Sequence, residues 1–364
     1  MESGRKPQEM ARRLWNPSRH AGSALRCVPA LLVVFCLSAV CAADFPRGFF
    51  VEDLRQQPPV PAFYNLDSHQ LQPFSFREAY ANFIDIMWDQ VQGRVFFSAR
   101  KTPKDPYRVY LKSWPDGEEK VIYENPLGPF RFLISPDGRQ LVVQVMGPSA
   151  WPILAVHDWE TSHTILLGQG FSPDWSPDGQ SLIFLQIVEN SLPSWLAEYR
   201  VETGTTTLLM KEPVAEAVYA DSPDLIVLKT AKQSRTCDVF QVWNRRKDTY
   251  TPFSVDPPVR RGKSCPVQRE VNAFPGHQFL SFKESADATD LSEQTLVIAD
   301  MSGGRLQTIA REDWDPKATA VEATTLAVGE DPLYVLSADG TGERLEVPKA
   351  RFIRPTHASR ASAQ

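Results

Sequence analysis

The sequence predicts an all-β fold built from a repeated unit of short strands. The clearest copies are residues 130–143 and 171–185, each with an apolar strand, a Ser-Pro-Asp-Gly turn and a second apolar strand. In such a turn proline presets the second position, Asp suits the third, and Gly takes the left-handed fourth position of a bulged hairpin. The copies begin 41 positions apart (130 to 171), and a hairpin recurring about every 40 residues is typical of β-propeller blades.

The turn residues of these two copies are expected to be structural: Pro136, Asp137, Gly138, Pro177, Asp178 and Gly179. Their Asp-Gly pairs do not indicate calcium, because the dense ladder of Asp residues found in calcium loops is missing. The six histidines are scattered without metal-ligand spacing. We therefore expect neither a metal site nor a cofactor.

Residues 1–43 are typical of a signal peptide. Arg12, Arg13, Arg19 and Arg26 give a positive charge before an apolar run of about 13 residues, and Cys41-Ala42-Ala43 offers small residues for cleavage before Asp44. The run is too short to span a bilayer comfortably. We expect an exported protein, periplasmic or extracellular, with no stable membrane span after cleavage. An uncleaved anchor or a lipoprotein is the alternative.

Three further segments follow the signal peptide. Residues 44–82 are rich in proline and aromatic residues, too apolar for a free linker, and are expected to form an extended arm packed on the propeller. Residues 83–350 are expected to be the propeller, and residues 351–364 a disordered C-terminal tail. Six four-stranded blades are expected, with five or seven as alternatives. Their repeats begin near Phe83, Phe130, Phe171, Val214, Val271 and Ala318.

Charge and cysteine content limit the function classes. A formal net charge of −5 and a pI near 5.8 give no global basic field, so no nucleic-acid partner is expected. Of five cysteines, Cys237 and Cys265 lie beyond the signal peptide, and in an oxidising compartment they are candidates for a disulfide. Closing the loop of about 28 residues between them would stabilise the folded state by roughly 3 to 4 kcal/mol. Two buried free thiols are the alternative.

The repeat at 130–143 and 171–185 resembles the WD-like repeat of TolB-type propellers. That resemblance implies a secreted or periplasmic propeller used largely as a scaffold for protein contacts. It covers most of residues 83–350 as architecture but only these two repeats as motif. TolB itself carries an α/β domain before its propeller, and the arm at 44–82 is too short to be one. Prolyl-oligopeptidase-type peptidases share such repeats, but their Gly-x-Ser-x-Gly nucleophile motif is missing from this sequence.

The innermost strand of each blade lines the central channel, so its polar residues are candidate binding residues. Aligning the other repeats with the two clear ones gives five of them: Asp85, Arg131, Asp174, Glu216 and Glu270. Carboxylates and an arginine around one axis could bind a cation or a sugar, or perform acid–base chemistry. The alternative is a wet channel that tolerates charge.

A basic cluster stands out in this acidic chain. It includes Arg260, Arg261 and Lys263 beside Cys265, and Arg245, Arg246 and Lys247 upstream. It is a candidate surface for an acidic partner, with a solvated loop face as the alternative. We expect a non-catalytic scaffold that binds a protein or a glycan in the cell envelope. The alternative is a small hydrolase or lyase that uses Asp85, Asp174 and Glu216.

Overall fold

The computed structural model describes residues 45–351, with gaps at 58–59, 126–129, 147–150, 189–190, 231–238, 254–266, 275–276, 286–293, 302–303, 310–317, 323–324, 329–332, 339–343 and 348. Within these ranges all regular secondary structure is β-strand. No helix long and apolar enough to cross a membrane occurs in the described part of the chain.

The described strands pair into seven antiparallel four-stranded units. Unit 1 consists of β26 (Ala350–Arg351), β1 (Gly48–Asp53), β2 (Val60–Asn65) and β3 (Gln70–Pro73). Unit 2 consists of β4 (Asn82–Asp89), β5 (Arg94–Arg100), β6 (Tyr107–Ser113) and β7 (Glu119–Asn125). Unit 3 consists of β8 (Phe130–Ile134), β9 (Gln140–Met146), β10 (Pro152–Asp158) and the first half of β11 (His163–Trp175).

Unit 4 consists of the second half of β11, β12 (Ser181–Val188), β13 (Ser191–Arg200) and the first half of β14 (Thr205–Tyr219). Unit 5 consists of the second half of β14, β15 (Leu225–Thr230), β16 (Gln241–Asn244) and β17 (Thr249–Pro252). Unit 6 consists of β18 (Val267–Ala273), β19 (Phe279–Ser285), β20 (Gln294–Asp300) and β21 (Arg305–Ile309). Unit 7 consists of β22 (Ala318–Glu322), β23 (Thr325–Val328), β24 (Leu333–Ser337) and β25 (Leu345–Val347).

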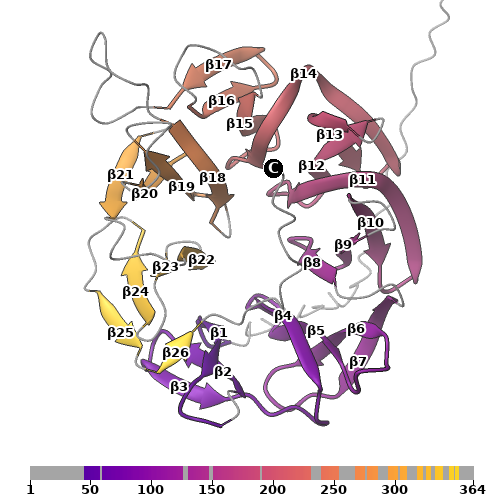
Figure 1. Ribbon diagram of the computed structural model, residues 1–364, viewed down its shortest axis with the longest axis vertical. Helices are drawn as coiled ribbons and strands as arrows, with labels where there is room; N and C mark the ends of the chain where they lie inside the picture. The colour runs from indigo at the N-terminus through magenta and orange to yellow at the C-terminus, as the bar shows by residue number, and fades with distance from the viewer. Residues whose placement is uncertain are drawn as a thin grey trace, which may run out of the picture. The chain divides into compact units, whose positions relative to one another are not determined.

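The long strands β11 and β14 each belong to two units, which makes units 3, 4 and 5 one continuous ten-stranded sheet. In β11, His163–Gln169 pairs with β10 as the outermost strand of unit 3, and Gly170–Trp175 pairs with β12 as the innermost strand of unit 4. Figure 1 shows the units following one another around a ring, with β4, β8, β18 and β22 on their inner sides. Polar side chains on these inner strands are therefore brought toward one axis.

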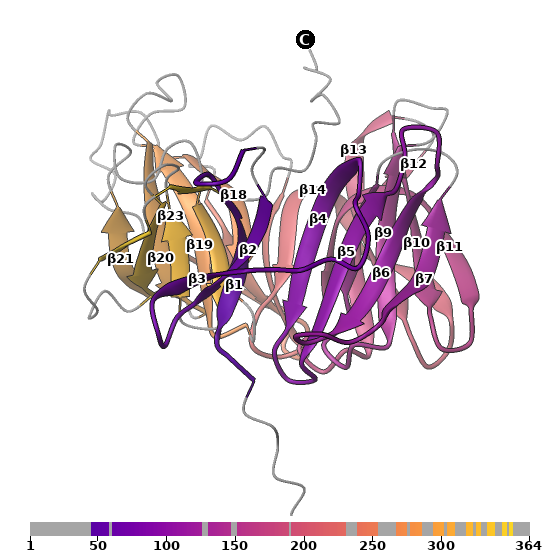
Figure 2. The same cartoon turned by 90° about the horizontal axis from the view of Figure 1, so that it is seen from below.

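The two ends of the described chain meet in unit 1. Strand β26 pairs with β1 through Glu52 opposite Arg351 and Asp53 opposite Ala350, and Leu54 N donates to Lys349 O at 2.8 Å. Strand β1 contacts β4 on one side and β22 on the other, so unit 1 lies between units 2 and 7 (Figure 1, Figure 2). The stretch 44–82, expected as an extended arm, thus supplies three strands of a unit that the C-terminal segment completes.

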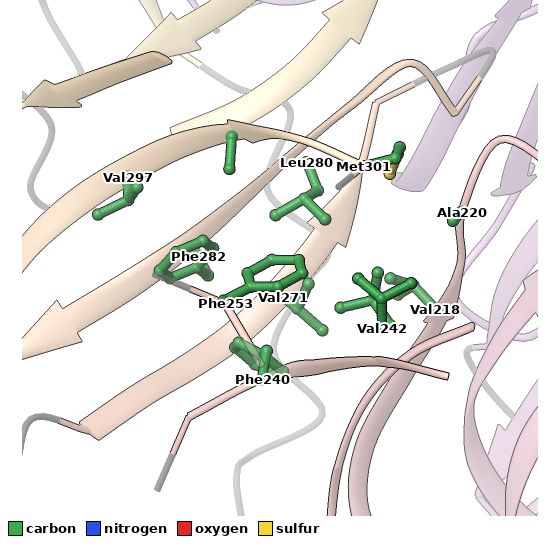
Figure 3. Packing of buried hydrophobic residues seen from close by; sticks show 12 residues of the cluster. Val218, Ala220, Phe240, Val242, Phe253, Val271, Leu280, Phe282, Val297 and Met301 are labelled. Carbon is green, nitrogen blue, oxygen red and sulfur yellow. The ribbon is translucent and has the colours of Figure 1, made fainter. Parts of the chain in front are cut away.

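The core is divided into seven clusters of buried apolar residues, each between two neighbouring units. Figure 3 shows the cluster between units 5 and 6, in which Phe240, Phe253 and Phe282 lie against aliphatic side chains such as Val218 and Leu280. Another joins units 7 and 1 through Val335, Val347 and Phe49. Each unit therefore packs against the one before and the one after it, and the first packs against the last.

This arrangement is that of a β-propeller, but the expected number of six blades is not confirmed, because the described pairings form seven units. Burial on both faces explains why these strands have continuous apolar sequences. In β9, for example, Leu141, Val142 and Val143 are almost fully buried between the clusters on both faces. A strand buried on both faces reads as a continuous apolar run.

The two Ser-Pro-Asp-Gly turns have the same hydrogen bonds. At the first, Ser135 Oγ lies 2.6 Å from Asp137 Oδ1 and accepts from Gln140 N at 2.9 Å. At the second, Ser176 Oγ lies 2.6 Å from Asp178 Oδ1 and accepts from Ser181 N at 2.9 Å. Gly138 and Gly179 have φ of 68° and 69°, a region that favours glycine.

Candidate binding site on the inner strands

The inner strands carry β-bulges at corresponding positions, and the candidate carboxylates lie at them. Register shifts occur at Phe83/Asp85, Phe171/Asp174, Val214/Glu216, Arg269/Asn272 and Ala320/Glu322. A bulge inserts an extra residue, bends the strand and re-aims its side chains. The bulges thus determine where Asp85, Asp174, Glu216 and Glu270 point.

Asp174, on β11 of unit 4, binds the backbone of the next unit. Its Oδ2 accepts a hydrogen bond from Tyr219 N at 2.6 Å, and Tyr219 O lies 3.1 Å from the ring Nδ1 of His277. Burial raises the pKa of Asp174 to about 6, against the opposing effects of the His277 charge and the Tyr219 N–H. The carboxyl of Asp174 therefore joins unit 4 to unit 5, and the neighbouring imidazole continues the contact to unit 6.

Glu216, on β14 of unit 5, has the same role one unit further on. Its Oε1 lies 2.9 Å from Lys229 Nζ, and its Oε2 accepts from Val271 N of unit 6 at 3.0 Å. Glu270, on β18, has a left-handed φ of 56° and lies 2.6 Å from Lys283 Nζ on the adjacent strand. Three of the four candidate carboxylates are therefore occupied by amides or ammonium groups of the protein itself.

Asp85, on β4 of unit 2, has a different environment. Its Oδ1 accepts only a local hydrogen bond, from Ile86 N at 3.0 Å, within the described residues. Burial raises the pKa of Asp85 to about 6, against the opposing effects of that N–H and of the Arg131 charge. Opposite Asp85 on β5 lies Ser98, fully buried, whose Oγ has no hydrogen-bond partner among the described residues.

A cavity of about 310 Å³ lies beside Asp85 and Arg131, formed mainly by β8 and β9 of unit 3 and the bulged part of β11. Its lining residues are Asp85, Arg131, Phe132, Leu133, Val142, Gln144, Phe171, Ser172 and Pro173. Arg131 lies opposite Gln144 in the β8–β9 register. Ser172 is exposed and has a left-handed φ of 51°. Two of the five predicted channel residues, Asp85 and Arg131, thus line one cavity.

A second polar cavity, of about 460 Å³, was not anticipated from the sequence. It lies beside Glu198, which is 1% exposed and binds Arg245 through two hydrogen bonds of 2.5 and 3.0 Å. Arg200 Nε and Tyr219 OH donate to the same carboxylate, each at 3.1 Å. Burial alone would raise the pKa of Glu198, but Arg245, Arg200 and Tyr219 hold it below its usual value. A lone glutamate inside the apolar strand Trp195–Tyr199 was the sequence signal for this network.

Arg245 and Arg246 were grouped with the basic cluster, yet both are paired in the structure. Arg245 binds Glu198, and Arg246 Nε lies 2.7 Å from Asp224. Arg260, Arg261, Lys263, Cys237 and Cys265 lie outside the described residues, as does the expected signal peptide. Among the residues that the structure describes, no three His, Cys, Asp or Glu side chains are grouped so that they could hold a metal ion.

No protein-family model matches the chain, and no curated protein sequence matches it. Solved structures do. Prolyl oligopeptidase B from Galerina marginata has a TM-score of 0.56 at 12% identity, over 85% of this chain and 52% of that one. Oligogalacturonate lyase from Vibrio parahaemolyticus has a TM-score of 0.55 at 10% identity, over 84% and 85%.

TolB from Acinetobacter baumannii has a TM-score of 0.45 at 17% identity, over 72% of this chain. The chain spans 63% of the length of that TolB structure and about half of the length of the prolyl oligopeptidase. At such identities a likeness shows the fold alone. The comparisons and the pairing of the strands together show that this chain has a β-propeller fold.

Proposed function

We propose that this protein is a non-catalytic, extracytoplasmic β-propeller scaffold that binds a protein or glycan partner in the cell envelope. In this proposal residues 1–43 are a cleaved signal peptide, and the propeller begins with the arm at 44–82. Cys237 and Cys265 form a disulfide. The basic residues Arg260, Arg261 and Lys263 form a contact surface for the partner, in addition to the polar residues of the inner strands.

The observation that carries the proposal is the occupation of the inner-strand carboxylates. Asp174 and Glu216 accept backbone N–H groups of the following unit, and Glu216 and Glu270 are paired with lysines. A general acid or base must be free to reach the proton that it transfers. Carboxylates used to hold neighbouring units together suit a rigid platform better than a catalyst.

The alternative is a small hydrolase or lyase that uses carboxylates at the channel. The observation that favours it is the environment of Asp85. Its carboxyl has a pKa of about 6 and lies beside a cavity that Arg131 also lines. A carboxyl with a raised pKa in a cavity is a candidate acid–base group. Solved oligogalacturonate lyases share the fold at 10–11% identity, which does not carry their activity to this chain.

Recovery of partners from the native envelope tests the two readings. The full chain with a C-terminal tag is expected to enrich a protein or glycan, and charge reversal at Arg260, Arg261 and Lys263 is expected to reduce that recovery. The intact mass of the recovered protein is expected to lack residues 1–43. Asp174→Asn and Glu216→Gln should leave the recovery unchanged. The opposite result is turnover of a panel of glycosides or esters, at a rate that falls roughly a hundredfold or more in Asp85→Asn or Asp174→Asn. That result would contradict the scaffold proposal and support an enzyme.

A further inference from the structure

The cavity beside Arg131 contains polar groups that the described protein leaves unused. Arg131 is exposed, and its side chain makes no hydrogen bond or ion pair with another described residue. The side-chain amide of Gln144, opposite Arg131 in register, likewise has no hydrogen-bond partner within the described ranges. By contrast, Arg245 in the second cavity is held by both oxygens of Glu198.

Most of the other residues that line this cavity are apolar, with Asp85 and Ser172 as the exceptions. Its walls include Phe132, Leu133, Val142, Phe171 and Pro173. Between the last two lies Ser172, an exposed non-glycine residue in the left-handed region at the β11 bulge. Strain of this kind persists only where the surroundings enforce it, and it gathers at ligand sites. The bulge thus brings a hydroxyl to the rim of the cavity, next to the apolar residues Phe171 and Pro173.

We propose that this cavity binds a carboxylate attached to a compact apolar group, either as a free acid or as the last residue of a peptide chain. The inference rests on the proposed function, because it names the chemistry by which the scaffold would recognise a ligand.

The chemistry of the lining residues selects this ligand. A guanidinium presents paired N–H donors that match a carboxylate, and an arginine without a protein partner is free to do so. The amide of Gln144 and the hydroxyl of Ser172 supply further hydrogen bonds. A volume of about 310 Å³ is at the lower end of ligand pockets, which suits a group the size of one residue. A sugar fits less well, because the only rings are Phe132, which is 5% exposed, and Phe171.

Asp85 makes this binding depend on pH. The residue facing it from β5 is the neutral Ser98, and the charge acting on it from β8 is Arg131. Strand β1, which also packs against β4, carries Glu52 and Asp53, but neither is among the groups that shift the pKa of Asp85. Ionised Asp85 attracts Arg131 and repels a bound carboxylate, whereas protonated Asp85 does neither. The affinity for a monocarboxylate is therefore expected to fall as pH rises through about 6.

Titration of the purified full chain with N-acetyl-leucine and with its amide, followed by NMR or calorimetry, tests the proposal. The acid is expected to bind at least tenfold more tightly than the amide at pH 5. Arg131→Gln should abolish that difference, whereas the matched variant Arg139→Gln, an exposed turn arginine on the same unit, should keep it. Asp85→Asn should bind the acid more tightly than wild type at pH 7.5 and remove the pH dependence. Equal binding of acid and amide, or an unchanged preference in Arg131→Gln, would overturn the proposal.

A short peptide ending in leucine, as free acid and as amide, distinguishes the two sources of the carboxylate. Binding of the peptide acid assigns the cavity to a chain end, and binding of N-acetyl-leucine alone assigns it to a small acid. An unchanged melting temperature of Arg131→Gln shows that any loss is local. If the envelope partner is recovered but no carboxylate binds, this inference fails and the scaffold stands. If turnover is found, the scaffold fails.

Discussion

Polar side chains are paired with one another at the boundary between units 4 and 5, whereas two of them have no described partner at the boundary between units 3 and 4. At the first, Glu198 binds Arg245, Arg200 and Tyr219, and Asp174 binds the Tyr219 N–H, so the charged groups are matched. At the second, Arg131 and Gln144 face a cavity without described partners. A buried polar group without a partner is costly, whereas a solvated one is not.

This difference indicates where a ligand could bind to this protein. Matched charges fasten one unit to the next, and a ligand could reach them only by breaking those contacts. Unmatched groups at the rim of a cavity offer hydrogen bonds at no such cost. Four predictions test whether the paired groups at the first boundary stabilise the fold and whether Arg131 at the second does not. They begin with the largest expected effect.

Glu198→Ala should cost about 3 kcal/mol of the free energy of unfolding, because it leaves the largely buried guanidinium of Arg245 without its counter-charge. Urea unfolding would measure the loss. Glu202→Ala, an exposed glutamate four residues along the same hairpin, is the control and should stay within about 0.5 kcal/mol of wild type. A loss for Glu198→Ala as small as that of the control would mean that this boundary is not held by its ion pairs.

Asp174→Ala should cost about 1–3 kcal/mol, because the buried N–H of Tyr219 loses its acceptor. Asp174→Asn keeps an acceptor oxygen at the same place and should cost less. Both are best compared by urea unfolding near pH 5, where wild-type Asp174 is largely protonated. If Asn costs as much as Ala, the hydrogen bond to Tyr219 does not join the units.

The raised pKa values of Asp85 and Asp174 set a sign for the pH dependence of stability. Each carboxyl ionises near 3.8 in the unfolded chain and near 6 in the folded one, so the unfolded state holds fewer protons in between. Their contribution to the free energy of unfolding must therefore fall as pH rises from about 4 to 6. Relative to wild type, Asp85→Asn and Asp174→Asn should gain stability across that window and level off above it. We expect a modest gain, because both side chains are partly exposed. A difference that stays flat from pH 4 to 7 would contradict the raised pKa values.

Arg131→Gln should change the free energy of unfolding by less than about 0.5 kcal/mol, the smallest effect of the four. The reason is that the side chain of Arg131 makes no hydrogen bond or ion pair with the rest of the described chain. Thermal unfolding monitored by circular dichroism would measure it. A loss comparable to that of Glu198→Ala would show that Arg131 is a structural residue after all.

The strands around the two clear turns could be predicted because their signals are local. Ser135 and Ser176 bind groups within five residues of themselves, and the apolar runs after both turns need only their own composition to be recognised. The number of units could not be predicted in this way. Unit 1 takes strands from both ends of the described part of the chain, and neither segment alone contains a signal for the pairing of Asp53 with Ala350.

The same distinction between local signals and contacts of distant segments applies to the candidate site. The sequence alone predicted that Asp85, Arg131, Asp174, Glu216 and Glu270 would lie on inner strands, because each aligns with a position in the first strand of the two clear repeats. Only the tertiary structure decided which of them are occupied. Asp174 meets its amide partner 45 residues away, Glu216 meets its partner 55 residues away, and Glu198 meets Arg245 at a separation of 47. These contacts depend on how one unit packs against the next, and the same packing leaves Arg131 beside a cavity.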